Sequence, residues 1–323
     1  MRRREFMTLI GAMAAAWPGP AHPQAAATIG YLDSRSEQSD APFTAAFQRG
    51  LAESGGNQRT IIEFRWADND PAVLANLANQ LIATKPAVIV AAGGAITAIA
   101  LKKLTKDIPI VFVNGADPVK TDLVHSINRP EANFTGVSFL ATQIVAKRLE
   151  LLLELVPNAK LISAIVNPKN PDFASMVRDF EAAQRTFHVQ FKVYQASTMP
   201  EIEAAFADME AHRPNALLIG GDAYYNGVRR YLIAQSTRLS LPSIFDVREF
   251  AAEGGLISYG TSQTEAYRQA GLYVGRILRG AVPADLPVLQ SARFELIINI
   301  ATAKALGVAV PNKLMALADE VIE

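Results

Sequence analysis

The sequence contains no cysteine in its 323 residues. Disulfide bonds, catalytic thiolates and zinc–sulfur sites are therefore excluded, because each of them needs a cysteine sulfur. The absence does not assign a compartment, since an exported protein can also fold without disulfides.

Histidine is nearly as scarce, with four residues in the chain. His22 falls in an amino-terminal leader, and His125, His188 and His212 have no partners at metal-ligand spacing. We expect these three histidines on the protein surface, and we predict no metal site and no cofactor.

The glycine motifs of several large enzyme classes are also missing. No stretch matches Gly-x-x-x-x-Gly-Lys-Ser/Thr, and Gly93-Gly94 lacks the Gly-x-Gly-x-x-Gly spacing of a dinucleotide site. Ser258 lies near glycines, but no Gly-x-Ser-x-Gly elbow surrounds it. Neither a P-loop, nor a dinucleotide fingerprint, nor a nucleophile elbow is therefore present.

Neither sign of charge is in excess, with 31 basic and 31 acidic side chains. The first 27 residues hold three arginines and one glutamate, so the remainder has 28 basic and 30 acidic side chains. Without a basic surplus, we predict no nucleic-acid partner and no attachment to an anionic membrane. A DNA-binding regulator is also disfavoured because the leader stands where a helix-turn-helix would be.

The amino terminus has the pattern of an export signal over residues 1–27. Arg2-Arg3-Arg4-Glu5-Phe6-Met7 precedes an apolar run over residues 8–17, about half the roughly 20 residues that span a membrane. Prolines end this run, and the alanines at 25–27 suit a signal peptidase. The paired arginines resemble a twin-arginine signal, with the Sec route as one alternative and an amphipathic helix of the fold as another. We predict a periplasmic protein, not embedded in the membrane, from which the signal is removed.

Apolar strands alternate with amphipathic helices through the rest of the sequence. The first half predicts strands at 28–33, 60–66, 87–92 and 108–113 and helices at 41–54, 70–84 and 95–104. The second half predicts strands at 161–166, 189–194, 216–219 and 241–245 and helices at 142–155, 172–187 and 200–212. A short strand at 254–260, a helix at 264–278, a linker-like stretch at 283–287, a strand at 294–298 and a helix at 302–306 follow.

This alternation predicts an α/β protein with two similar lobes, each a parallel sheet flanked by helices. A weak internal similarity supports it, since residues 88–112 and 217–245 both run strand, glycine pair, helix and proline-containing strand. The length also suits two domains of ordinary size.

Four aspartates follow apolar strands, two in each half: Asp33, Asp117, Asp222 and Asp246. Because ligands bind at the carboxyl ends of parallel strands, these carboxylates can line a cleft, with Asp222 or Asp246 paired to an ammonium or hydroxyl group. Alternatively, each aspartate only caps the next helix. Tyr224, Tyr225 and Tyr259 likewise either stack on a ligand or pack in the core.

The stretch 108–138 is central to the arrangement. A buried strand opens into the loop Asn114-Gly115-Ala116-Asp117-Pro118, and a second extended segment over residues 135–139 leads on to a long helix. We interpret this stretch as a crossover between lobes beside a ligand cleft.

Several motifs resemble the ABC transporter substrate-binding protein family with the type I periplasmic fold. They are residues 108–119, Thr135-Gly136-Val137-Ser138, residues 254–260, and residues 294–307. The resemblance covers essentially the whole chain after the leader, and the branch most similar includes tryptophan- and phenylalanine-binding members. It implies three crossovers and hinge closure on the ligand. It also implies that 28–137 and 262–290 form lobe 1, and 138–261 and 291–323 form lobe 2.

The resemblance further implies contacts with the ligand from both lobes. They are Asp33, Ser34, Gly94, Ala95 and Asp117 in lobe 1, and Asn167, Asp222, Ala223 and Asp246 in lobe 2. The predicted function is solute binding without catalysis: a monomer captures a small molecule, an amino acid or an aromatic compound, and passes it to the permease subunits of an ABC transporter. Two alternatives are a secreted α/β enzyme that uses strand-end carboxylates and a ligand-sensing subunit of a membrane receptor.

Overall fold

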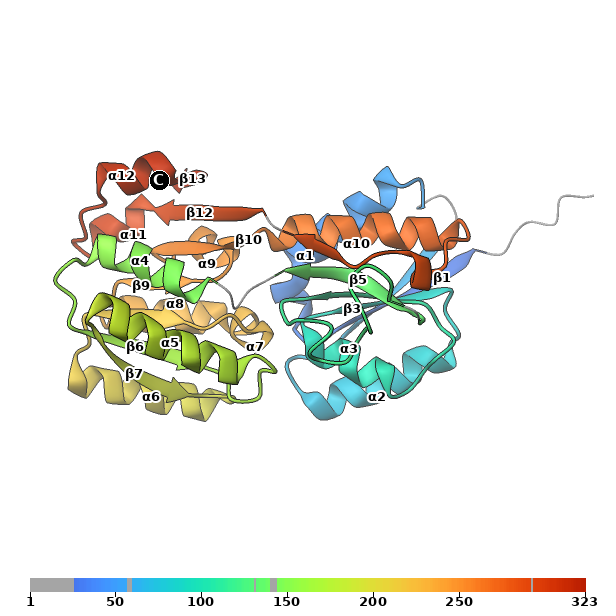
Figure 1. Cartoon of the computed structure of the whole chain (residues 1–323), viewed down its shortest axis with the longest axis horizontal. Helices are drawn as coiled ribbons and strands as arrows, with labels where there is room; N and C mark the ends of the chain where they lie inside the picture. The colour runs from blue at the N-terminus through green and yellow to red at the C-terminus, as the bar shows by residue number, and fades with distance from the viewer. Residues whose placement is uncertain (1–25, 57–59, 131, 140–143, 292) are drawn as a thin grey trace, which may run out of the picture.

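The computed structural model describes residues 26–56, 60–130, 132–139, 144–291 and 293–323. These residues form two lobes side by side, each a sheet with helices on both faces (Figure 1). The predicted fold class is confirmed. Of the predicted signal at 1–27, residues 1–25 lie outside the described part of the chain.

Lobe 1 contains a six-stranded sheet in the order β11-β5-β4-β3-β1-β2, in which all neighbouring strands are parallel. Its strands are β1 (Ala27–Asp33), β2 (Thr60–Trp66), β3 (Val88–Ala92), β4 (Ile110–Asn114), β5 (Phe134–Phe139) and β11 (Leu289–Ser291). Its helices are α1 (Glu37–Glu53), α2 (Pro71–Ala83), α3 (Ala95–Lys102) and α10 (Gln263–Leu278).

The central strands β3 and β4 of lobe 1 are buried at every position because both faces of the sheet are covered. In β4, Val111 and Val113 pack in the cluster beneath α1 and α10, whereas Ile110 and Phe112 pack beneath α2 and α3. Figure 1 shows these two helix layers above and below the sheet. The covered faces leave the carboxyl ends of the strands as the open edge.

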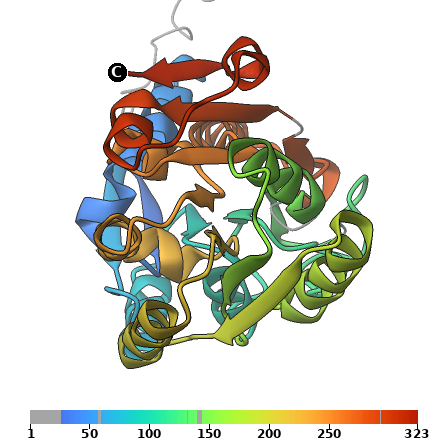
Figure 2. The ribbon, with the colours of Figure 1, turned by 90° about the vertical axis from the view of Figure 1, so that its left-hand side faces the viewer.

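Lobe 2, which faces the viewer in Figure 2, contains a seven-stranded sheet in the order β13-β12-β10-β9-β8-β6-β7. Its strands are β6 (Leu161–Val166), β7 (Gln190–Gln195), β8 (Ala216–Ile219), β9 (Ser243–Phe245), β10 (Ile257–Thr261), β12 (Phe294–Asn299) and β13 (Glu320–Ile322). Its helices are α4 (Val145–Leu155), α5 (Phe173–Phe187), α6 (Met199–His212), α7 (Ala223–Gly227), α8 (Arg229–Arg238), α9 (Arg248–Ala252), α11 (Ile300–Ala305) and α12 (Asn312–Leu317).

Strand β12 departs from the parallel pattern, since it runs antiparallel to β10. The reason lies in the connection: the chain enters β12 directly from β11 of the other lobe and not from a helix on the face of the same sheet. A parallel neighbour normally requires such a helical crossover.

The chain passes between the sheets after β5, after β10 and after β11, which gives the three predicted crossovers. Strand β5 continues to Phe139 and β11 to Ser291, both within the first sheet, whereas the sequence placed the changes of lobe after residues 137 and 290. The exact lobe boundaries stay a prediction.

The stretch predicted as a linker, 283–287, is structured instead. A short 3₁₀ helix at Pro283–Asp285 leads into β11, which pairs with β5. The hydroxyl of Thr135 donates to the carbonyl of Leu286 at 2.7 Å, so this segment is attached to the sheet. Prolines made the stretch appear irregular, but an edge strand tolerates proline at its start.

Candidate functional site

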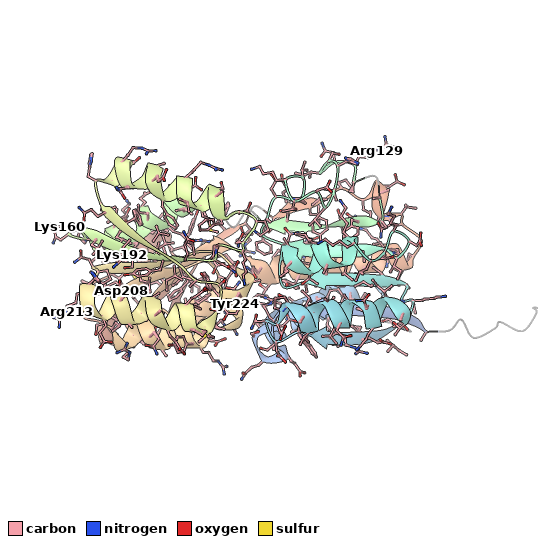
Figure 3. The ribbon with its side chains drawn as sticks, turned by 90° about the horizontal axis from the view of Figure 1, so that it is seen from below. Arg129, Lys160, Lys192, Asp208, Arg213 and Tyr224 are labelled. Atoms are coloured by element: carbon pink, nitrogen blue, oxygen red, sulfur yellow. The ribbon has the colours of Figure 1, made fainter. Side chains whose placement is uncertain are left out.

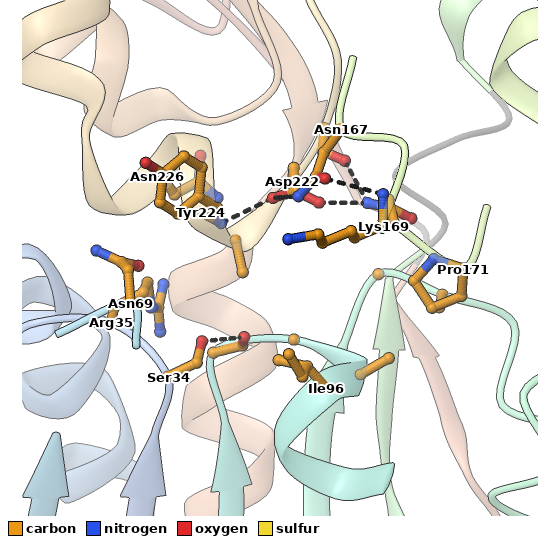
Figure 4. A pocket seen from close by; sticks show the side chains of 18 of the residues that line it. Ser34, Arg35, Asn69, Ile96, Asn167, Lys169, Pro171, Asp222, Tyr224 and Asn226 are labelled. Carbon is orange, nitrogen blue, oxygen red and sulfur yellow. Dashed lines mark hydrogen bonds between the residues drawn. The ribbon is translucent and has the colours of Figure 1, made fainter. Parts of the chain in front are cut away.

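The two lobes enclose a pocket of about 300 Å³ at the carboxyl ends of their strands. Loops after β1, β3 and β4 contribute from lobe 1, and loops after β6, β8 and β9 contribute from lobe 2. Figure 4 shows the lining side chains pointing into this space from opposite sides. Seven predicted contact residues line the pocket: Ser34, Gly94, Ala95, Asn167, Asp222, Ala223 and Asp246. Asp33 and Asp117 do not.

Asp33 lies behind the wall of the pocket, with no exposed surface. Its carboxylate holds the guanidinium of Arg35, with Nε at 3.0 Å from Oδ1 and Nη2 at 2.7 Å from Oδ2. Arg35 does line the pocket, and its Nη2 also donates to Asp40 and to the hydroxyl of Tyr267. Asp33 therefore supports the pocket through Arg35, because it is the partner that a buried cation needs.

Asp117 caps a turn beside the pocket. Its Oδ1 accepts hydrogen bonds from the backbone N–H groups of Val119 and Lys120, at 2.9 and 3.2 Å. The two residues before it, Gly115 and Ala116, line the pocket in its place. The capping alternative considered from the sequence thus describes Asp117.

Asp222 is held rigidly at the upper side of the pocket (Figure 4). Its Oδ1 accepts from Asn167 Nδ2 at 3.0 Å and from the N–H of Tyr224 at 2.9 Å, while its Oδ2 accepts from Asn170 Nδ2 at 2.7 Å. Burial raises the pKa of Asp222, and these donors oppose the shift. Asp222 both caps α7 and faces the pocket, so the two alternatives are not exclusive here.

Asp246 is the least satisfied charge in the pocket. It is 3% exposed, and its Oδ1 has no hydrogen-bond partner among the residues that the structure describes. Burial raises the pKa of Asp246 to about 7, and the charge of Arg148 opposes the shift only in part. Arg148 is itself buried and donates from Nε to the carbonyl of Tyr259 at 2.7 Å. A buried carboxylate oxygen without a hydrogen-bond partner is costly and invites a ligand cation.

The amino terminus of α3 faces Asp222 from lobe 1. Its N-cap residue, Gly94, provides no side chain, so the first N–H groups of the helix are left for a ligand. Gly94 has φ +95°, and a Cβ there would lie 3.1 Å from the Cβ of Ala223 in the other lobe. Glycine at this position therefore lets the two lobes approach closely.

Lys169 and apolar side chains complete the lining. Lys169 extends across the cleft below Asp222 (Figure 4), and within the described residues it forms no ion pair. Leu74, Ile96 and Tyr224 give apolar walls, and Tyr224 lies where the lobes meet (Figure 3). The sequence missed Lys169, although its loop between two prolines was visible as a strand-end signal.

Two of the three tyrosines considered for stacking belong to the core. Tyr225 is fully buried and donates to the carbonyl of Ala196 at 2.6 Å, and Tyr259 stacks on Phe294. Only Tyr224 lines the pocket. The packing alternative is correct for the other two.

His125, His188 and His212 are exposed, as expected. Within the described ranges, no group of three or more histidine, aspartate or glutamate side chains could hold a metal ion. In the same ranges, no helix is both long and apolar enough to cross a membrane.

The chain is similar in sequence or in fold to several known proteins. A tyrosine-binding protein of Clostridioides difficile (strain R20291) is 26% identical over 245 residues, which are 76% of this chain and 70% of that protein. A Streptococcus pneumonia ABC domain in complex with L-Trp has a TM-score of 0.82 at 26% identity, covering 92% of this chain and all of that one. An adhesive substrate-binding protein of Clostridium difficile, solved ligand-free and open, has a TM-score of 0.65 at 23% identity, covering 92% of this chain and 99% of that one.

The sequence model of one family matches residues 37–322. The match includes most of both lobes and every pocket-lining residue except Ser34 and Arg35. The chain belongs to the family of ABC transporter substrate binding proteins.

Proposed function

We propose that this solute-binding protein is exported to the periplasm, binds an α-amino acid with an aromatic or apolar side chain, and delivers it to an ABC permease. The observation that carries the choice of ligand is the unpartnered Oδ1 of Asp246 in a pocket that also holds the uncapped amino terminus of α3. The carboxylate of Asp246 suits a ligand ammonium, and the amino terminus of α3 suits a ligand carboxylate. The L-Trp and tyrosine relatives support the same class.

In this proposal each part of an amino acid contacts a complementary group of the pocket. The ammonium pairs with Asp246, and the carboxylate accepts hydrogen bonds from the first N–H groups of α3 and from Lys169. The side chain packs against Leu74, Ile96 and Tyr224. The pocket volume of about 300 Å³ lies at the lower end of the usual range for small-molecule sites.

Measuring the binding of analogues that lack one charged group tests this assignment. Residues 28–323 are unfolded, dialysed and refolded to remove carried-over ligand, and then titrated calorimetrically with L-tyrosine and L-tryptophan. We expect binding of at least one of them, and losses of at least about tenfold in affinity for tyramine, which lacks the carboxylate, and for 3-(4-hydroxyphenyl)propionate, which lacks the ammonium. Equal affinity for the amino acid and both analogues would contradict the proposed contacts.

Affinity should also fall as the solution becomes acidic. Because the pKa of Asp246 is raised to about 7, the empty site gains a proton on this carboxyl below that pH. A bound ammonium favours the carboxylate and lowers its pKa, so binding releases the proton. We expect Kd to be about tenfold higher at pH 6 than at pH 8. Titrations in buffers of different ionisation enthalpy count the released protons, and no release at pH 6 would argue against an ammonium at Asp246.

Export and transport are tested separately from binding. We expect the protein in the periplasmic fraction, shortened by its leader, and we expect a deletion strain to lose uptake of the ligand. Normal uptake with a lost response to the ligand would favour the sensing role instead. Recovery of chemically unchanged ligand from the denatured complex would argue against the secreted enzyme.

A further inference from the structure

The side chain of Arg148 lies behind the pocket, under the face of the lobe 2 sheet that α4 covers. Arg148 is 1% exposed and is not a lining residue. Its Nε donates to the carbonyl of Tyr259 at 2.7 Å, whereas Nη1 and Nη2 have no hydrogen-bond partner among the described residues. A buried guanidinium with two unpartnered nitrogens is costly, so its position calls for a nearby negative charge.

Strand β10 brings Arg148 close to Asp246. Asp246 follows β9, which pairs with β10, and the Tyr259 carbonyl that holds Arg148 belongs to β10. At the next residue, Gly260, a Cβ would lie 1.8 Å from the backbone oxygen of Asp246 and 3.4 Å from Nη2 of Arg148. Because a backbone oxygen in a sheet cannot move aside, only glycine fits here. The missing side chain leaves the guanidinium beside Asp246.

Asp246 connects this buried cation to the pocket. It lines the pocket, and its Oδ1 lacks a partner among the described residues, as Nη1 and Nη2 of Arg148 do. Burial raises the pKa of Asp246 and lowers the pKa of Arg148, and the charge of each group opposes the shift of the other. The carboxylate thus has a cation behind it and the pocket in front of it.

Two acids near Asp246 make its ionisation harder. Asp222, the N-cap of α7, and Glu249, a buried residue of α9, both raise the pKa of Asp246 by their charge. Lys169 lines the same pocket and is assigned above to the carboxylate of the ligand. Arg148 is therefore the buried cation that offsets both acids and the burial of the carboxylate.

We infer that Arg148 is a positioning residue: its buried guanidinium keeps Asp246 ionised from behind the pocket and so sets the lowest pH at which the ligand ammonium binds well. Arg148 acts only through Asp246, because it does not line the pocket itself. The inference rests on the proposed function for the ammonium of the ligand, but the ionisation of Asp246 can be measured without any ligand.

The first test is Arg148→Met in residues 28–323, titrated with L-tyrosine or L-tryptophan between pH 6 and pH 9. Compared with the native protein at the same pH, we expect the affinity to fall about tenfold at pH 7 but less than about twofold at pH 9. The reason is that the carboxyl of Asp246 then loses its proton about one pH unit higher. A loss of affinity by the same factor at every pH would indicate a merely structural role and overturn the inference.

Three further variants separate the charge of Arg148 from its packing. Arg148→Lys keeps the charge and should leave the pH dependence within about half a unit of the native one. Arg148→Gln keeps a donor for the carbonyl of Tyr259 but no charge, and should reproduce the shift even where methionine impairs folding. Lys147→Met removes a neighbouring cation of α4, which pairs with Glu150, and should leave the profile unchanged. Equal shifts in Lys147→Met and Arg148→Gln would contradict a role specific to Arg148.

Carbon-13 NMR of the aspartate carboxyl groups follows the same ionisation without a ligand, with the Asp246 signal identified by its loss in Asp246→Asn. We expect a midpoint near the pKa of about 7 that burial gives Asp246, and a midpoint at least about one unit higher in Arg148→Gln. An unchanged midpoint in Arg148→Gln and Arg148→Met would overturn the inference, whether or not an amino acid binds. A raised midpoint in a protein that binds neither L-tyrosine nor L-tryptophan would confirm the role of Arg148 and overturn only the ligand class.

Discussion

Asp246→Asn should weaken the binding of L-tyrosine or L-tryptophan by at least about 100-fold at pH 8, or roughly 3 kcal/mol. Asparagine keeps the shape of the side chain but removes the charge that an ammonium needs in this buried place. Isothermal titration measures the change, with competition experiments if the native protein binds too tightly. Because the carboxyl is gone, the variant should also lose the proton release expected near pH 6.

The matched control for this variant is Asp117→Asn. Asp117 also follows a strand of apolar residues, yet it caps a turn beside the pocket and does not line it. We expect the affinity of Asp117→Asn to stay within about twofold of the native protein, because the Asp117 side chain does not line the pocket and asparagine can still cap the turn. Equal losses of affinity in Asp246→Asn and Asp117→Asn would mean that the charge of Asp246 has no special role.

Arg35→Met should lower the free energy of unfolding by roughly 3–5 kcal/mol. Arg35 is 1% exposed and lies between two carboxylates with no exposed surface, Asp33 and Asp40. Burial and the nearby Asp33 already raise the pKa of Asp40 to about 7, so its charge is disfavoured even with the guanidinium present. Methionine leaves both acids without their cation. Urea denaturation followed by circular dichroism gives the change.

Two further variants show whether the effect comes from the unpaired acids. Arg65→Met removes an arginine whose partner, Glu63, is 3.5 Å away at the surface, and should cost less than about 1 kcal/mol. Arg35→Met combined with Asp33→Asn and Asp40→Asn should regain most of the lost stability, since no buried charge remains. Arg35→Met with nearly native stability, or a triple variant no better than the single one, would contradict the proposed electrostatic cause.

The alternation of elements was readable from the sequence because each element has its own periodicity. Apolar runs such as Val88–Ala92 must be strands buried on both faces, and the helices that cover them show the three- and four-residue spacing of an amphipathic surface. The stretch 283–287 was predicted as a linker because the three-residue edge strand that follows it is too short to show any period. Packing against β5, which no local pattern reveals, orders it.

By itself the sequence determined the two α/β lobes and the polar residues at the carboxyl ends of the strands, because local periodicity and strand direction suffice for both. It did not distinguish Asp246 from Asp33 and Asp117, which follow strands in the same way. Only the tertiary structure decided which of these residues lines the pocket, which pairs with a buried arginine and which caps a turn. That choice depends on strand order and on the approach of the two lobes, which are contacts between residues far apart in the chain.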